Sequence, residues 1–275
     1  MKNLITRTDD FGSAFAADGV ILQALKKGDY VKNVSCMAVA PYIENDAKEL
    51  EELRKKKGIC IGLHATLNSE WIKVDYNSVL NPKEISSLVD ENGKFIMHPM
   101  FFENRMPKTA ECIREISAQL DKLTTLGLTV EYVDTHMLPD AVVPGLKEAL
   151  TEFARKKGLI DQRWFYTFAE EHQPVLDGNK SLQKDAAAYN KWFESFEEDK
   201  QYINILHPAR YSEETKLFYN QALTGDEVAR SREAEQQLLN SGKLEEFCEK
   251  LEIKRIKYTE AVPQGDTTLS AAMNF

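Results

Sequence analysis

The chain has 275 residues, of which 43% are hydrophobic and 29% are charged. A chain of this length buries most of the surface that it exposes when unfolded, and it is typical of one large α/β domain. Its formal net charge of −9 disfavours a nucleic-acid partner, because a phosphate backbone requires a basic face, and favours a neutral small molecule.

The cysteines and the first residues indicate the compartment in which the protein works. The four cysteines lie far apart without a Cys-x-x-Cys pair, so we expect no disulfide framework and a reducing compartment; they are Cys36, Cys60, Cys112 and Cys248. The N-terminus lacks the long apolar segment of a signal peptide, and no apolar run approaches the roughly 20 residues needed to cross a bilayer. We therefore expect a cytoplasmic protein with no membrane partner.

Strand-like and helix-like segments alternate along most of the chain. Short apolar runs predict strands at residues 4–8, 34–40, 59–63, 129–134, around 163–165, 202–206 and 253–258. Apolar residues at helical spacing predict helices at residues 14–27, 46–57, 109–126, 144–157, 226–239 and 243–251. The run at 59–63 is fully apolar, as in a parallel strand that is buried on both faces.

Two segments interrupt this alternation. Residues 67–106 form a long insertion with a candidate hairpin at residues 91–93, and such excursions often become lids or binding loops. Residues 170–200 are acidic and irregular, although the aromatic residues at 192–196 share a helix-compatible spacing. Those aromatic side chains could pack on a second subunit, so the sequence is compatible with a homodimer.

The order of the segments predicts one α/β domain over residues 1–275, with about seven parallel strands in a barrel-like sheet. An open, doubly wound sheet is the alternative. It is disfavoured because no Gly-x-Gly-x-x-Gly follows any of the predicted strands.

Asp9 and Asp10 follow the first predicted strand and precede the first helix. One interpretation is a turn that also caps the helix, since Asp and Gly favour both positions. The other is a functional pair, in which an extended backbone points the two carboxylates in opposite directions. One carboxylate would then bind a metal ion while the other acts as a base.

Three of the five histidines also follow predicted strands: His64, His136 and His207. A single histidine at such a place is more often a core or turn residue than a ligand. Barrel enzymes, however, keep their active sites at the C-terminal ends of the strands, where all three histidines and the aspartate pair converge. This convergence favours the functional interpretation.

The residue types in this set suit metal-assisted hydrolysis. One aspartate and two neutral imidazoles make a facial site for a divalent ion that leaves positions for water and substrate. The ion would polarise a carbonyl group and acidify the bound water, the second aspartate would accept a proton, and the third histidine would donate one. Magnesium or zinc is favoured, and manganese, cobalt and nickel are compatible with the same ligands.

Four ordered motifs resemble those of the YdjC-like carbohydrate deacetylases, a family that includes the chitooligosaccharide deacetylases. The motifs are Arg7-Thr8-Asp9-Asp10-Phe11-Gly12, Gly62-Leu63-His64-Ala65-Thr66-Leu67, Val133-Asp134-Thr135-His136-Met137 and Leu206-His207-Pro208. The resemblance implies a deformed (β/α) barrel that removes an acetyl group from an N-acetylated sugar. It implies that Asp10, His64 and His136 bind the metal, that Asp9 is the general base and that His207 is the acid.

The chain departs from that family's usual pattern at two places beside the site. Arg7-Thr8 stands where the family commonly has Asn-Ala, and Ala209-Arg210 follows His207-Pro208 where it commonly has Gly. We therefore expect the chemistry to be shared more closely than the sugar that is recognised.

Three further residues are candidates for substrate binding. Thr66 lies two residues beyond His64, Arg163 lies in a strand-like run, and Trp71 could stack on a sugar ring. The alternatives are an ion pair for Arg163 and a packing role for Trp71.

Other functions remain open on the sequence alone. A metal-dependent isomerase or lyase would use the same ion and base, and a sugar-binding protein without catalysis would keep the same pocket. A non-haem iron oxygenase is compatible with the ligand types alone.

Overall fold

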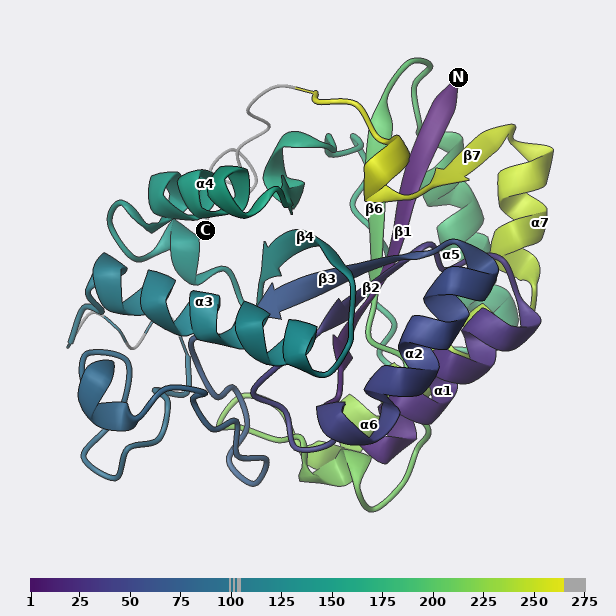
Figure 1. Cartoon of the computed structure of the whole chain (residues 1–275). Helices are drawn as coiled ribbons and strands as arrows, with labels where there is room; N and C mark the ends of the chain where they lie inside the picture. The colour runs from purple at the N-terminus through teal and green to yellow at the C-terminus, as the bar shows by residue number, and fades with distance from the viewer. Residues whose placement is uncertain (99, 101, 103–104, 265–275) are drawn as a thin grey trace.

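The computed structural model describes residues 1–98, 100, 102 and 105–264, and its strands all run parallel. The strands are β1 (Lys2–Phe11), β2 (Asn33–Cys36), β3 (Cys60–Ala65), β4 (Val130–Thr135), β5 (Ile160–Asp161), β6 (Gln201–Leu206) and β7 (Ile253–Ile256). The helices are α1 (Phe15–Lys27), α2 (Ile43–Lys57), α3 (Thr109–Thr125), α4 (Leu146–Lys157), α5 (Leu182–Glu194), α6 (Gly225–Asn240) and α7 (Lys243–Lys250). The prediction of a parallel α/β barrel is confirmed in the form of a curled, incomplete barrel (Figure 1).

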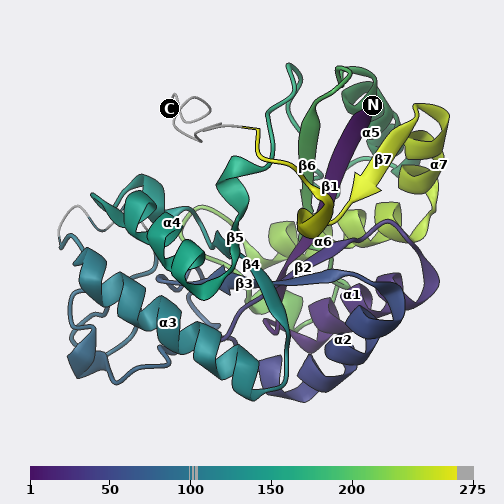
Figure 2. The ribbon, with the colours of Figure 1, turned by 45° about the horizontal axis from the view of Figure 1, so that its top comes forward.

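Strand β1 is the centre of the sheet. The strand order is β5-β4-β3-β2-β1-β6, and β7 pairs with the first half of β1 on the edge that β2 uses in the second half. The helices are arranged around the outside of this curled sheet (Figures 1 and 2). Because both faces of β1 are covered, its residues from Leu4 to Phe11 are all buried.

Alternate residues of the strands point to the inside of the curl, where a small group of buried side chains gathers. That group contains Ile5, Cys60, Tyr132, Tyr166, Ile203, Ile256 and Tyr258. Gly62 of β3 is part of this interior, because a Cβ built on it would lie 2.1 Å from the Tyr132 ring. The Tyr132 hydroxyl, 2.8 Å from the Ser35 hydroxyl, fixes that ring in place. The same alternation, continued along each strand, directs polar residues inward at the C-terminal end.

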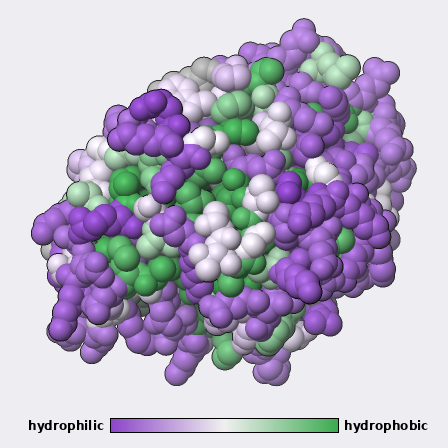
Figure 3. Space-filling model, in the orientation of Figure 1, coloured by the Kyte–Doolittle hydropathy of each residue, from purple (hydrophilic) through white to green (hydrophobic). Residues whose placement is uncertain are grey.

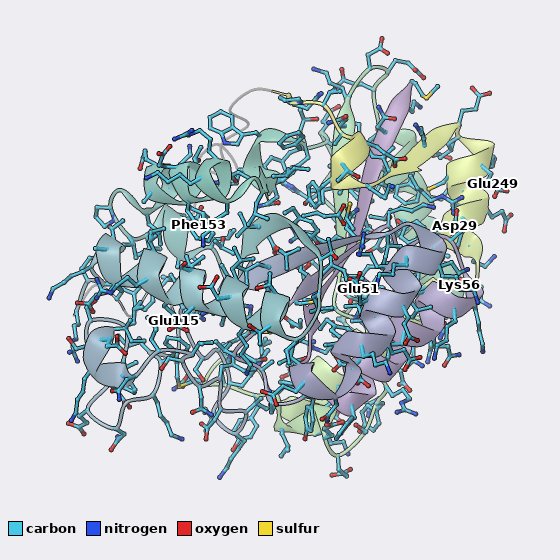
Figure 4. The ribbon with its side chains drawn as sticks, viewed as in Figure 1. Asp29, Glu51, Lys56, Glu115, Phe153 and Glu249 are labelled. Atoms are coloured by element: carbon cyan, nitrogen blue, oxygen red, sulfur yellow. The ribbon has the colours of Figure 1, made fainter. Side chains whose placement is uncertain are left out.

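The insertion packs against the domain through buried carboxylates of α3. Glu115, labelled in Figure 4, accepts hydrogen bonds from the backbone N–H groups of Val79 and Leu80, and Glu111 accepts from Ser87. An antiparallel bridge joins Val89 and Phe95, as the candidate hairpin predicted. These contacts attach the insertion to the barrel, while its role as a lid stays a prediction.

Several expectations from the sequence are wrong in detail. The strand expected around residues 163–165 is limited to Ile160–Asp161, because Asp161 caps the 3₁₀ turn Gln162–Trp164 that follows. Residues 182–194, expected to be irregular, form α5. Its aromatic residues pack on one another and on Tyr202 and are buried, so they do not provide a surface for a second subunit; they are Trp192, Phe193 and Phe196.

The outer face of the helices is largely hydrophilic, with hydrophobic residues grouped toward the middle and left of the view in Figure 3. Within the described part of the chain, no helix is both long enough and apolar enough to span a bilayer.

The packing inside the barrel can be tested at Gly62. We expect Gly62→Ala to lower the free energy of unfolding by about 3 kcal/mol, the upper end for an overpacked core, because the added methyl group collides with Tyr132. Gly19→Ala in α1 is the matched control, since its Cβ meets only Arg210 at 3.7 Å, and it should be neutral or stabilising by up to about 1 kcal/mol. Urea unfolding measures both changes, and equal stability of the two variants would contradict the packing.

Candidate active site

The polar residues that follow the strands converge on one pocket of about 650 Å³. Asp9 and Asp10 come from the end of β1, His64 from β3, and His136 and His207 from the residues that follow β4 and β6. The alternation of side chains along each strand explains most of these positions. Asp9, like Arg7, points to the same side of β1 as the interior residue Ile5, and His64 points to the same side of β3 as Cys60.

Asp10 reaches the same pocket because the backbone of β1 is irregular there. Thr8 pairs with Val34, and Phe11 pairs with Cys36. Between these two pairs β1 advances by three residues while β2 advances by two, so β1 contains one extra residue. Asp10 adopts a left-handed conformation with φ +63°. An irregularity of this kind redirects a side chain, and both carboxylates line the pocket instead of pointing in opposite directions as expected.

The turn after Asp10 belongs to this arrangement and does not cap the helix. The N-cap residue of α1 is Ala14, and neither aspartate caps it. Gly12 has φ +101°, and a Cβ on it would lie 2.9 Å from the Cβ of Ile43. Its N–H donates to the buried Asp18 carboxylate at 2.7 Å. Glycine is therefore required by both conformation and space.

Asp10, His64 and His136 place three ligand-type atoms close together. His64 Nε2 lies 3.2 Å from His136 Nδ1, and Asp10 Oδ1 lies 3.6 and 3.7 Å from these two nitrogens. The point in the plane of the three atoms that is equidistant from them lies about 2.0 Å from each, close to the distance at which nitrogen and carboxylate ligands hold a divalent metal. Asp10 Oδ1 is buried and accepts no hydrogen bond from the described residues. These three residues fit a metal ion.

The other ring nitrogens of the two histidines face carboxylates. His64 Nδ1 lies 2.5 Å from Asp134 Oδ2, and His136 Nε2 lies 3.2 Å from Glu70 Oε2. Carboxylates in this position orient metal-binding imidazoles. Burial lowers the pKa of His64, but Asp134, Asp9 and Asp10 outweigh it and raise the pKa to about 9. The surrounding negative charge thus favours a cation at this place, either a proton or a metal ion.

A second group of candidate ligands, Asp9, His64 and Asp134, is already neutralised by Arg7. The buried guanidinium contacts the Asp9 carboxylate at 2.6 and 2.7 Å and lies 3.3 Å from Asp134 Oδ2. It also donates to Gln162 and Tyr258. Arg7, which departs from the family's usual motif, therefore fixes the orientation of Asp9 and occupies the position that a second cation would need.

Helix α6 supplies two site residues that the sequence analysis missed. Arg232 donates to Asp10 Oδ2 at 2.9 Å, and its guanidinium lies 5.1 Å from the centre of the Phe218 ring. Burial raises the pKa of Asp10. The nearby Arg232 and the three histidines of the pocket outweigh burial and hold the pKa of Asp10 well below its usual range. Arg232 and Glu235 stand three residues apart in a predicted helix, so they share one face of it. This spacing of opposite charges is the feature of the sequence that could have indicated both residues.

Glu235 lies beside His207 in the pocket. The His207 backbone N–H donates to the Glu235 carboxylate, which fixes the chain at the end of β6. Burial raises the pKa of Glu235, although His207 and Arg232 oppose that shift. The His207 ring is partly exposed toward the pocket, where it can reach a bound molecule.

The three residues expected to bind substrate lie in different surroundings. Trp71 lines the pocket, whereas Thr66 and Arg163 do not. The Thr66 hydroxyl donates to the His64 backbone carbonyl at 2.9 Å. Arg163 is buried and pairs with Asp161 at 2.6 Å and Asp140 at 2.9 Å, so the structure gives it a supporting role away from the pocket.

Arg163 is nevertheless connected to the site. Asp140, its partner, accepts a hydrogen bond from the Thr135 hydroxyl at 2.6 Å, and Thr135 lines the pocket next to His136. The ion pair therefore supports the end of β4. It corresponds to the ion-pair alternative of the sequence analysis, but in a buried position.

Backbone strain is concentrated at this pocket. Six non-glycine residues of the described chain have positive φ, and four of them line the pocket: Asp10, Glu70, Met137 and Leu138. Such conformations cost free energy and persist where the surrounding structure enforces them, most often at functional sites. Their grouping here distinguishes this pocket from an incidental cavity.

The fold and the ligand geometry define a (β/α) barrel protein with a candidate divalent-metal centre at the C-terminal ends of its strands. The chain belongs to the family described as YdjC-like protein, which it matches over residues 3–250. The family resemblance noted in the sequence is therefore confirmed.

Two curated relatives share part of the chain. A carbohydrate deacetylase of Listeria welshimeri is 29% identical over 151 residues, which cover 54% of this chain and 57% of that protein. A carbohydrate deacetylase of Thermoanaerobacter pseudethanolicus is 30% identical over 142 residues, or 50% of each chain. The chain thus spans about half the length of the curated relatives that it matches.

A solved structure from Enterococcus faecalis V583, described provisionally as a cellobiose-phosphate cleavage protein, has a similar fold. It is 22% identical, with a TM-score of 0.72, and the match covers 95% of this chain and 99% of that one. This similarity supports the barrel architecture.

The metal site can be tested by binding alone. We expect the purified protein to bind one divalent ion, with manganese or zinc as the probe, and His64→Ala or His136→Ala to remove that binding. Asp134→Asn should weaken it by roughly 10- to 100-fold, because His64 loses its orienting carboxylate. Calorimetry measures each affinity, with the exposed His172→Ala as control. Unchanged affinity in both histidine variants would contradict the site.

Proposed function

We propose that the protein is a metal-dependent hydrolase that removes the acetyl group from an N-acetylated mono- or oligosaccharide. The observation that carries this proposal is the triangle of Asp10, His64 and His136 with a separate carboxylate, Asp9, beside it in one pocket. A binding protein needs no such spare carboxylate.

In this proposal Asp10, His64 and His136 hold the ion, with magnesium or zinc favoured and manganese, cobalt or nickel compatible. The ion would polarise the amide carbonyl and make a bound water more acidic. Asp134 and Glu70 orient the two imidazoles, and Arg232 keeps the Asp10 carboxylate ionised. These residues prepare the site before substrate arrives.

Asp9 is suited to the role of general base. Its carboxylate points into the pocket, and the two contacts from Arg7 fix its orientation. It would accept a proton from the attacking water. His207, on the wall formed by β6 and α6, would then donate a proton to the departing amine nitrogen.

The substrate class is supported by the pocket and the relatives. Trp71 and Tyr166 are largely buried but line the pocket, where the exposed parts of their rings add apolar surface against which a sugar ring can pack. The volume of about 650 Å³ lies within the range of small-molecule sites. The curated relatives named carbohydrate deacetylase match about half of this chain.

The different roles proposed for Asp9 and Asp10 can be tested by measuring metal binding and turnover separately in variants of each residue. We expect Asp9→Asn to retain the ion but to lower kcat for acetate release from N-acetylglucosamine oligomers by roughly 10²- to 10⁴-fold. Asp10→Asn should lose both the ion and activity. Acetate is measured by an enzyme-coupled assay, with and without chelator, and the exposed Asp199→Asn is the control.

Two results would overturn the assignment. Activity that survives in Asp10→Ala and His136→Ala would exclude the proposed ligands. Conversion of the sugar without release of acetate would instead favour the isomerase or lyase alternative.

A further inference from the structure

Two guanidinium groups line the pocket, and both are already paired with carboxylates. Arg7 and Arg232 are the only lysine or arginine residues among its described lining residues. Arg7 contacts both oxygens of Asp9, and Arg232 contacts Asp10 at 2.9 Å. Each guanidinium therefore neutralises a carboxylate of the candidate active site itself.

Carboxylates outnumber these cations. Six line the pocket: Asp9, Asp10, Glu70, Asp177, Glu227 and Glu235. Two guanidinium groups, a divalent ion and a protonated His207 carry five positive charges against these six carboxylates, so the carboxylates remain in excess. A second negative group on the substrate would thus meet repulsion without a partner.

The N-terminus of α6, where Glu227 and Val228 line the pocket, is also closed to anions. An uncapped helix N-terminus is a ready-made phosphate site. Here the Thr224 hydroxyl accepts from the Glu227 N–H, and the Glu227 carboxylate accepts from the Thr224 N–H at 2.8 Å. Glu227 also lines the pocket, so α6 presents a carboxylate where a phosphate would bind.

The residues that the structure does not describe cannot reverse this balance, because residues 99, 101, 103, 104 and 265–275 include no lysine, arginine or histidine. Most of the remaining pocket wall is apolar. It includes Leu138, Phe168, Leu176, Ile203, Ile205 and Val228. An apolar wall suits the faces of an uncharged sugar ring, and the neutral polar residues of the lining, such as Asn179 and Ser231, offer no positive charge to offset that of a phosphate.

We propose that the pocket selects an uncharged N-acetylated glycan and discriminates against sugars that carry a phosphate group. This inference rests on the proposed deacetylase function and adds the charge class of its substrate. The discrimination comes from Glu227 and Asp177 on the pocket wall together with the commitment of both arginines to aspartates.

Paired substrates test this selection. We expect the metal-loaded protein to release acetate from N,N′-diacetylchitobiose with a kcat/KM at least about tenfold higher than from its 6-phosphate. Glu227→Gln and Asp177→Asn should each narrow that ratio, and Gln preserves the hydrogen-bonding capacity of the capping box. Glu249→Gln on α7, labelled in Figure 4 and away from the pocket lining, is the control and should leave the ratio unchanged.

The outcomes separate this inference from the proposed function. Equal turnover of the two substrates, or a preference for the phosphorylated one, would overturn the charge selection while the deacetylase function stands. If neither substrate releases acetate, the proposed function fails. Calorimetry with chitobiose and its 6-phosphate then tests the selection by itself: tighter binding of the neutral sugar supports it, and equal or weaker binding contradicts it.

Discussion

Three carboxylates, those of Asp9, Asp10 and Asp134, are buried together at the C-terminal ends of β1 and β4, and the structure depends on how their charge is compensated. Arg7 lies between Asp9 and Asp134, and Arg232 pairs with Asp10 from the other side. Buried charges without partners are costly, so each guanidinium is a condition for this arrangement. The free oxygen of Asp10 and the two imidazoles next to it then mark the one place in this group where a further cation fits.

This compensation also separates the tasks of the two adjacent aspartates. The irregularity in β1 and the positive φ of Asp10 turn both side chains to one pocket, where different arginines hold them. Asp9 makes two contacts with Arg7, which leaves it a fixed carboxylate beside the ligand triangle. Asp10 gives one oxygen to Arg232 and keeps the other free. A metal ligand and a base thus arise from neighbouring residues because their charge partners differ.

Much of this site could be predicted from sequence, because the position of a residue along a parallel strand determines at which edge of the sheet its side chain lies. His64, His136 and His207 follow apolar runs, and parallel strands bring their carboxyl ends to one edge. Arg232 could not be assigned in this way, since its partner Asp10 lies on another element. Arg7 stands two residues before Asp9 on the same strand, but its contact with Asp134 crosses the sheet and is not visible in the sequence. The buried placement of Arg163 depends on a 3₁₀ turn that its strand-like surroundings concealed. The direction of Asp10 depends on a backbone irregularity that an alternating pattern does not encode.

The division of roles between Asp9 and Asp10 and the orientation of both imidazoles depend on the position of one cation, which Asp10, His64 and His136 are assigned to hold. The most direct measurement is anomalous X-ray diffraction from crystals of the protein loaded with manganese. This ligand assignment predicts one peak about 2.0–2.2 Å from Asp10 Oδ1, His64 Nε2 and His136 Nδ1, with Arg7 still paired to Asp9. A peak between Asp9 and Asp134 with Arg7 displaced, or no peak at the triangle, would contradict it.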